Sequence, residues 1–176
     1  MDDRVDSIEA VSQFVRVREV ASGVDAIPTM SRMLLVDRTI SDINVQDSTF
    51  YDYTALHYQA EYGTTGSVAW LLRQDPPPDI EVRSADQFTP LMLAALSSED
   101  SEGKVRLLLD HGANRDKENQ FEKADHTALS LARWLHKPAS IIDILENYRP
   151  DVSRYNNKYI LYINNRQSDS KNSNSI

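Results

Sequence analysis

The stretch that decides the fold runs from residue 88 to residue 114. It reads FTPLMLAA at residues 88–95 and KVRLLLDHGAN at residues 104–114. Threonine can cap the first turn of a helix. That turn also tolerates proline, because a backbone N–H at this position would have no partner within the helix. An apolar second segment follows, and Gly112 favours the end of a helix. The stretch therefore predicts two helices joined by a short link.

The same unit occurs on both sides of this stretch. Thr54-Ala55-Leu56, Thr89-Pro90-Leu91 and Thr127-Ala128-Leu129 begin equivalent segments, separated by 35 and 38 residues. Each is followed by an apolar segment, at residues 68–72, 105–109 and 141–145. A period near 33 residues that opens with Thr-Pro-Leu-His and closes with Gly-Ala-Asn is typical of ankyrin repeats. The chain resembles the ankyrin repeat family over roughly residues 40–148, which implies an all-α solenoid of stacked helix-turn-helix units.

The residues before the first repeat predict a helical N-terminal cap. Ile8, Val11, Phe14 and Val15 recur at helical spacing, and a second apolar segment begins near Asp25. We interpret residues 6–38 as two antiparallel helices that form a degenerate capping repeat. Residues 1–150 would then form one ankyrin repeat domain that contains three repeats.

The chain departs from the family pattern at two kinds of position. Where the family usually has glycine two residues before the threonine, this chain has Asp52, Gln87 and Asp125. Aspartate tolerates a left-handed backbone better than most residues, and glutamine does so less well. The length beyond 33 residues is expected in loops, where insertions cost little. These insertions lie at residues 76–78, 97–102 and 120–124.

Residues 151–176 predict a tail that is disordered in part, because its end is rich in serine and asparagine. It contains one apolar run, Tyr159–Ile163. This run is expected to cover the end of the last repeat, since terminal repeats need a cap. It could instead dock on a partner protein, or act as an aggregation-prone strand.

The overall composition indicates an acidic protein that can bury a hydrophobic core. The 176 residues carry a net charge of −8, 40% are hydrophobic, and none is cysteine. No apolar run approaches the roughly 20 residues of a membrane helix, and no typical signal peptide begins the chain. We expect a cytoplasmic location, with the nucleus as the alternative. Acidic residues in excess usually form a solvated surface. They also disfavour the binding of nucleic acid and could attract a basic partner protein.

No pattern in the sequence indicates catalysis, a metal site or a cofactor. The four histidines, His57, His111, His126 and His136, lack the spacing of a metal site. No glycine-rich loop suited to phosphate precedes a helix. His57 reads as structural, because the family histidine at this place is bonded within its own repeat. His111, near the negative end of a helix dipole, also reads as structural.

The family resemblance implies where a partner protein would bind. The partner surface of an ankyrin array is formed by the turn before each threonine and by the end of each first helix. Several of the matching positions are aromatic or apolar, as in interface hot spots. The predicted partner-binding residues are Tyr51, Tyr53, Glu61, Tyr62, Asp86, Phe88, Leu96, Ser97, His126 and Trp134. Two alternatives stay open, in which Tyr53 packs on Phe88 or the tail covers Trp134 and Leu135.

These observations predict a non-catalytic protein-binding module, an adaptor or an inhibitor, that is monomeric alone. One alternative is an acidic escort that shields a basic client protein. Others are a subunit that completes an enzyme and an accessory domain of a larger assembly. The residues do not identify the partner.

Overall fold

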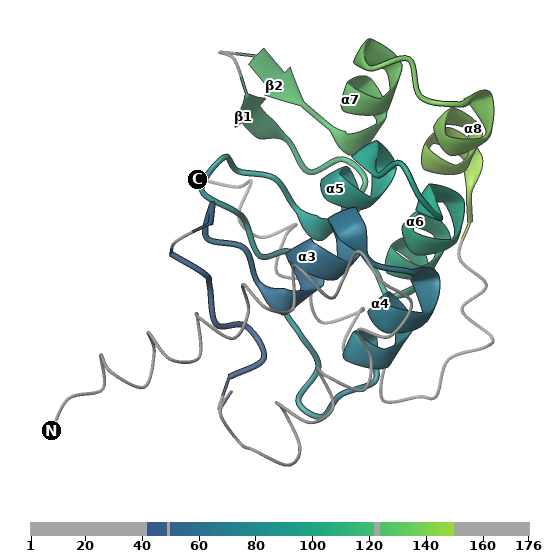
Figure 1. Ribbon diagram of the computed structural model, residues 1–176. Helices are drawn as coiled ribbons and strands as arrows, with labels where there is room; N and C mark the ends of the chain where they lie inside the picture. The colour runs from purple at the N-terminus through teal and green to yellow at the C-terminus, as the bar shows by residue number, and fades with distance from the viewer. Residues whose placement is uncertain (1–41, 49, 122–123, 150–176) are drawn as a thin grey trace, which may run out of the picture.

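The computed structural model describes residues 42–48, 50–121 and 124–149. The predicted capping helices at 6–38 and the tail at 151–176 lie outside these residues. The described elements are α3 (Ala55–Tyr62), α4 (Thr65–Leu72), α5 (Pro90–Leu96), α6 (Ser101–Asp110), β1 (Asn119–Phe121), β2 (Ala124–His126), α7 (Ala128–Trp134) and α8 (Ala139–Asn147). Within the described ranges they form three helix pairs, one for each predicted repeat (Figure 1).

The three predicted threonines begin the first helix of each pair. Thr54, Thr89 and Thr127 are N-caps, and the hydroxyl of each accepts a hydrogen bond from a backbone N–H in the first turn. In α3 and α7 the bond is reciprocated, because the side chains of His57 and Ser130 accept from the backbone N–H of the cap residue. Such capping satisfies donors that a helix start otherwise leaves unpaired.

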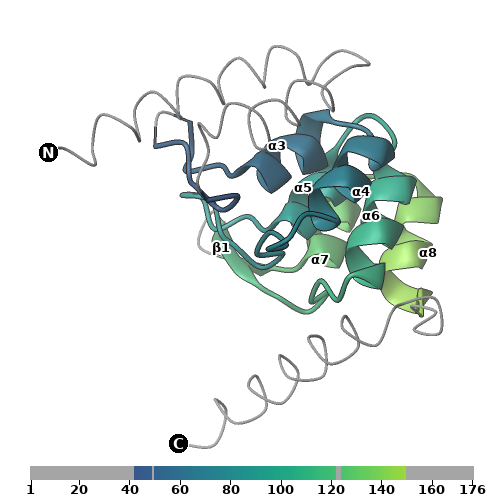
Figure 2. The ribbon, with the colours of Figure 1, turned by 90° about the horizontal axis from the view of Figure 1, so that it is seen from below.

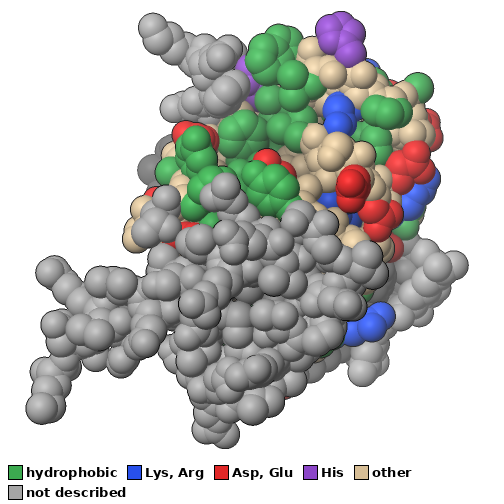
Figure 3. Space-filling view, viewed as in Figure 1, with side chains coloured by type: hydrophobic (Ala, Val, Ile, Leu, Met, Phe, Trp, Pro, Cys, Tyr) green, Lys and Arg blue, Asp and Glu red, His purple; other side chains and the backbone are tan. Residues whose placement is uncertain are grey.

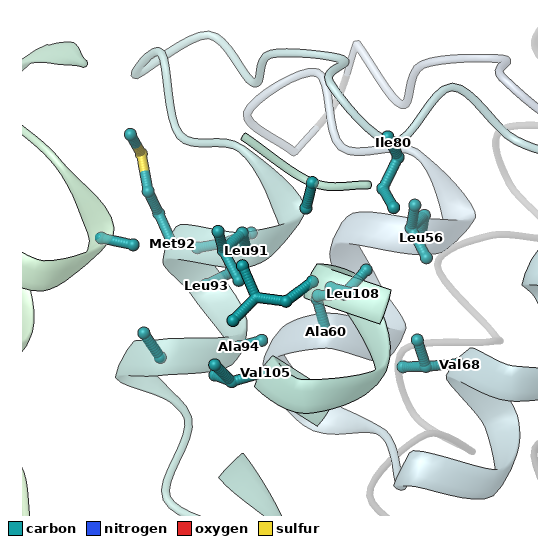
Figure 4. Close-up of a cluster of buried hydrophobic side chains, with 14 of the residues drawn as sticks. Leu56, Ala60, Val68, Ile80, Leu91, Met92, Leu93, Ala94, Val105 and Leu108 are labelled. Carbon is teal, nitrogen blue, oxygen red and sulfur yellow. The ribbon is translucent and has the colours of Figure 1, made fainter. Parts of the chain in front are cut away.

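The helix pairs stack into two layers. α5 packs between α3 and α7, and α6 packs between α4 and α8 (Figure 2). Small residues let the first helices approach closely, since Ala60, Ala94 and Ala132 are fully buried. The core between the layers is mainly aliphatic, with Leu56, Val68, Leu91, Val105 and Leu108 gathered in one cluster (Figure 4). Truncating a buried leucine of this kind to alanine typically costs about 2–5 kcal/mol.

The turn before each first helix closes in a similar way. The N–H of Asp47 donates to the carbonyl of Tyr53 (2.8 Å), and the N–H of Ser84 donates to the carbonyl of Phe88 (3.0 Å). Asn119 pairs with His126 in the third repeat. The repeated closure places the turns of all three repeats on the same side of the array (Figure 1).

Two of the three positions that lack the family glycine adopt the left-handed backbone. The φ angle is 53° at Asp52 and 64° at Gln87. Asp125 instead lies in β2, which pairs with β1 as an antiparallel hairpin. Residues 120, 121 and 124 of the insertion, predicted as a loop, therefore belong to the strands of this hairpin. The helical array remains as predicted, with one two-stranded addition.

Two lysines tie neighbouring repeats together. The ammonium of Lys104, fully buried in α6, donates to the carbonyl of Gly63 (3.0 Å) and to the hydroxyl of Ser97 (2.7 Å). Lys137 donates to the carbonyls of Leu96 (2.8 Å) and Ser97 (2.7 Å). Both ammonium groups therefore satisfy carbonyls near the C-terminal ends of α3 and α5, where a positive charge is favoured. Burial lowers the pKa of Lys104 to about 8, although Asp100, Glu99 and Glu61 favour its charge.

The third repeat exposes a polar side. Arg133 of α7 forms an ion pair with Glu146 of α8, and Ser140 and Asp143 of α8 are also exposed. Other residues of these helices, among them Leu131 and Ile144, are apolar and buried. None of the described helices is long and apolar enough to cross a membrane.

Candidate protein interface

The candidate interface is the surface formed by the C-terminal ends of α3, α5 and α7 together with the turns that precede these helices. We call it the α3–α5–α7 surface. Because the three helices lie side by side, equivalent residues of successive repeats become neighbours on it. At the helix ends these equivalents are Glu61, Leu96 and Trp134, followed by Tyr62, Ser97 and Leu135. In the turns they are Tyr53, Phe88 and His126.

The large hydrophobic side chains that stand exposed among the described residues all belong to this surface. The exposed fractions are 54% for Tyr51, 52% for Trp134, 47% for Leu135 and 39% for Tyr62. Hydrophobic side chains gather over β2 and α7, and acidic side chains lie on the same face (Figure 3). Phe88 and Leu96 are partly buried against the core, between the exposed groups of the first and third repeats.

Two of the predicted partner-binding residues are buried, so the structure corrects their assignment. Tyr53 is only 7% exposed, and its ring packs against the rings of Phe50, His57 and Tyr58. These rings belong to the same repeat as Tyr53, whereas the alternative from sequence had Tyr53 pack on Phe88 of the next repeat. Ser97 is 4% exposed, and its hydroxyl donates to the carbonyl of Glu61 (2.7 Å). Both residues support the surface from beneath.

His57 joins the first repeat to the second, which agrees with its structural interpretation. Its Nδ1 lies 3.1 Å from the backbone nitrogen of Thr54, and its Nε2 lies 3.1 Å from the carbonyl oxygen of Phe88. The Thr54 N–H needs a lone pair on Nδ1, so the proton of the neutral ring lies on Nε2 and is donated to Phe88. Burial lowers the pKa of His57 to about 4, although the bond to Phe88 favours its charge. A neutral His57 thus fixes the turn that carries Phe88.

His111 also has a structural place, but its charge is disfavoured. Its Nδ1 lies 2.8 Å from the carbonyl oxygen of Leu107 in the last turn of α6. Burial lowers the pKa of His111, and this effect outweighs the favourable bond to Leu107 and the nearby Asp110. The helix dipole favours a protonated, positively charged His111, but burial opposes this charge.

His126 and Trp134 are brought together by the third repeat. Their ring centroids lie 6.2 Å apart with an interplanar angle of 23°, so the rings stack. The hydroxyl of Ser130 lies 3.5 Å from Nδ1 of His126, which connects the hairpin to α7. The stack orients Trp134 while half of its side chain stays exposed. An oriented, exposed tryptophan is a suitable anchor for a partner.

Acidic side chains gather at the ends of α3 and α5. Burial is the main cause of the raised pKa of the Tyr53 phenol, and Glu61 and Asp86 raise it further. Glu61 also acts on the ammonium of Lys104, together with Glu99 and Asp100. Glu61 and Asp86 therefore lie near the phenol of Tyr53, and Glu61, Glu99 and Asp100 lie near the ammonium of Lys104. One carboxylate oxygen of Glu61, Oε2, is buried without a hydrogen-bond partner.

The described residues contain no cluster of three histidine, aspartate or glutamate side chains suited to a metal ion. What they assemble is an oriented aromatic and apolar surface with acidic groups beside it. Such an arrangement is suited to binding a protein.

The comparison with family models agrees with the stacked helix pairs. A model described as ankyrin repeats, in three copies, matches residues 26–119, more than half of the chain. This chain belongs to the ankyrin repeat family. Ankyrin repeats are general protein–protein interaction modules. The structure continues the ankyrin array beyond the match, because α7 and α8 form a third helix pair in the same arrangement. No curated protein matches the chain.

Sequence reasoning missed several features of this ankyrin surface. The ring stack of His126 on Trp134 joins residues from a hairpin and a helix, and the hairpin was not predicted. Phe50 was not singled out, although its ring contacts Tyr51, Tyr53 and Tyr58. A run of aromatic residues just before a predicted cap was the available signal for this cluster.

Proposed function

We propose that this chain is a non-catalytic adaptor or inhibitor that binds a partner protein through the α3–α5–α7 surface. The observation that carries the proposal is the location of the exposed apolar groups. Tyr51, Tyr62, Trp134 and Leu135 all lie on this surface, although the rest of the described chain offers many other exposed positions. A clustered apolar patch of this kind marks an interaction site more often than scattered single residues do.

Each part of the surface has a proposed role. Tyr51, Tyr62 and Trp134 supply apolar contact, and aromatic residues of this kind dominate binding energy at interfaces. Glu61 and Asp86 supply negative charge, which favours a basic partner. Phe88, Leu96 and His126 are partly buried, so they fill the surface between the exposed side chains.

The same chemistry guides the remaining proposals. A net charge of −8 repels the phosphates of nucleic acids, so the partner is a protein. The chain acts in the cytoplasm or the nucleus and is a monomer until it meets its partner. These statements rest on charge and on the family's general role in protein binding.

A second candidate is an acidic escort that masks a basic client. The gathering of Glu61, Glu99 and Asp100 around one ammonium favours it, because the local charge remains negative. An escort would bind mainly through charge and would tolerate loss of Trp134. The adaptor model requires Trp134, so one experiment separates the two.

The test is an affinity capture from cell lysate, read by mass spectrometry. Wild type is compared with a Tyr51→Ala, Tyr62→Ala, Trp134→Ala triple variant. The matched control is a Ser140→Ala, Asp143→Ala, Asn147→Ala triple variant, which changes exposed residues of α8. Circular dichroism confirms that all three proteins are folded.

The proposal expects a partner that wild type and the control retain and that the aromatic variant loses. A partner that the aromatic variant retains, and that high salt releases, would favour the escort. A partner lost only from the control would place the binding site on α8.

A further inference from the structure

The α3–α5–α7 surface has two chemically different parts. One part, over the first and second repeats, carries the carboxylates of Glu61 and Asp86, with those of Glu99 and Asp100 in the adjoining link between α5 and α6. The other part, over the third repeat, carries the exposed side chains of Trp134 and Leu135.

The basic groups inside the acidic part are already engaged. Lys104 is fully buried and donates to Gly63 and Ser97. Lys137 donates to the carbonyls of Leu96 and Ser97. Neither ammonium forms a close ion pair with a described carboxylate, because the one such pair in the described chain joins Arg133 to Glu146. The four carboxylates outnumber these two ammonium groups, so the local charge stays negative, and Asp86, Glu99 and Asp100 are exposed to an external group.

The carboxylate of Asp100 is also fixed in place, which prepares it for binding. Asp100 Oδ2 accepts a hydrogen bond from the backbone N–H of Thr65 (2.7 Å) at the start of α4. The hydroxyl of Ser97 donates to the backbone carbonyl of Glu61 (2.7 Å), which fixes the end of α3 that carries the Glu61 side chain. A site whose groups are positioned in advance loses less entropy when a ligand binds.

Resting on the proposed function, we propose that this surface binds one linear segment of its partner in which an apolar anchor neighbours lysine or arginine residues. The anchor packs on Trp134 and Leu135, and the basic residues lie over Glu61, Asp86 and Asp100. Charge complementarity selects this occupant, since a purely apolar segment would leave the acidic part desolvated and unpaired.

The geometry of the array sets the length of the segment. Packed helices lie about 8–10 Å apart, so the path from α7 across α5 to α3 is about 20 Å. An extended chain covers that distance in roughly six residues, at about 3.3 Å per residue. The basic residues therefore lie some three to six positions from the anchor in an extended segment.

The experiment is a selection from a phage-displayed library of random 12-residue peptides on the immobilised full-length chain. One enriched peptide is then synthesised with a fluorophore, and its affinity is measured by anisotropy at low and physiological salt. The variants are Trp134→Ala and the pair Glu61→Gln, Asp86→Asn. Asp143→Asn, which removes an exposed carboxylate on α8, is the matched control.

We expect enriched peptides that combine an aromatic or large aliphatic residue with at least two lysine or arginine residues. Trp134→Ala should weaken binding at least tenfold. The Glu61→Gln, Asp86→Asn pair should weaken it about fivefold or more and reduce its salt dependence. Asp143→Asn should change the affinity less than twofold.

The unfavourable outcomes separate this inference from the proposed function. Enriched peptides without basic residues, whose binding is still weakened by Trp134→Ala, would overturn the proposal that the segment is basic. The α3–α5–α7 surface would remain the proposed binding site. Basic peptides that are insensitive to Trp134→Ala would overturn both. No enrichment would overturn recognition of a linear segment, and the capture experiment would then decide the proposed function separately.

Discussion

The imidazole of His57 holds the carbonyl of Phe88 in the next repeat, with 3.1 Å between Nε2 and the oxygen. The opposite nitrogen of the ring faces the backbone nitrogen and the hydroxyl of Thr54, at 3.1 and 2.9 Å. One neutral side chain therefore closes the cap of α3 and positions the following turn. Protonation of Nδ1 would remove the lone pair that the Thr54 N–H uses.

This arrangement predicts that acid weakens the fold. The pKa of His57 is about 4 in the folded chain and 6.5 when unperturbed. Between these values the unfolded state binds more protons than the folded state, so stability falls as the pH falls from about 6.5 to about 4. The loss attributable to His57 is up to roughly 3 kcal/mol. Urea unfolding at a series of pH values measures it.

A His57→Leu variant is the control, because leucine does not titrate. At pH 7.5 it should be less stable than wild type by about 1–3 kcal/mol, since the Thr54 N–H and the Phe88 carbonyl lose their partner. The difference between the two proteins should shrink as the pH falls to about 4. A constant difference across this range would contradict the role of His57.

Lys104 predicts a second pH dependence, at the alkaline side. Burial lowers its folded pKa to about 8, against 10.5 when unperturbed. Between these values the unfolded state again holds the extra proton, so this group makes the fold more stable as the pH rises from about 8 to about 10.5. A Lys104→Met variant should lack this rise.

At neutral pH, Lys104→Met should lower the free energy of unfolding by about 2–4 kcal/mol. Its loss leaves the Gly63 carbonyl and the Ser97 hydroxyl without their donor, and breaking a buried charged network is costly. Denaturant unfolding at pH 7 and at pH 9.5 checks both statements. A variant as stable as wild type at pH 7 would show that the desolvation cost of the lysine outweighs its bonds.

The left-handed backbone at Gln87 predicts a stabilising substitution. Its φ of 64° costs a residue with a Cβ roughly 1 kcal/mol, and glycine avoids this cost. Gln87→Gly should therefore raise the free energy of unfolding by up to about 1 kcal/mol. Ala85→Gly, in the same turn without a positive φ, should lower it by about 0.5–1 kcal/mol. Equal effects of the two substitutions in thermal denaturation would argue against strain at Gln87.

The features predicted well from sequence are those that depend on neighbours in the chain. Thr54, Thr89 and Thr127 were assigned as helix starts because a cap needs only its own first turn. Contacts between distant residues were harder to predict. Nothing near His57 in the sequence points to Phe88, 31 positions later, or to the lysine bonds that cross from one repeat to another.

Tyr53 shows why the surface was predicted only in part. Tyr51 and Tyr53 are two residues apart and were assigned to the same side of the turn. Tyr51 and Asp52 both have a φ of 53°, and two successive left-handed residues change the direction of the chain. Tyr51 consequently faces solvent, and Tyr53 enters the core. Ser97 was misplaced because its donor, Lys104, belongs to the following helix.

The last prediction concerns the tail, whose role as a cap remains a prediction from sequence. A terminal repeat needs a cover only where it exposes apolar surface. The exposed Trp134 and Leu135 of the third repeat belong to the proposed partner surface. The α8 side of this repeat instead exposes Asp143 and Glu146, and Arg115 donates to the carbonyls of Leu145 and Tyr148 at the end of α8. We therefore expect a chain that ends at residue 150 to melt within about 2 °C of the full-length chain.

A chain that ends at residue 143 is the control. It loses the buried Ile144 and Leu145 and should melt far lower. A drop of more than about 4 °C on removing residues 151–176 corresponds to roughly 1 kcal/mol. It would show that the tail stabilises the array and would return Tyr159–Ile163 to the role of a cap.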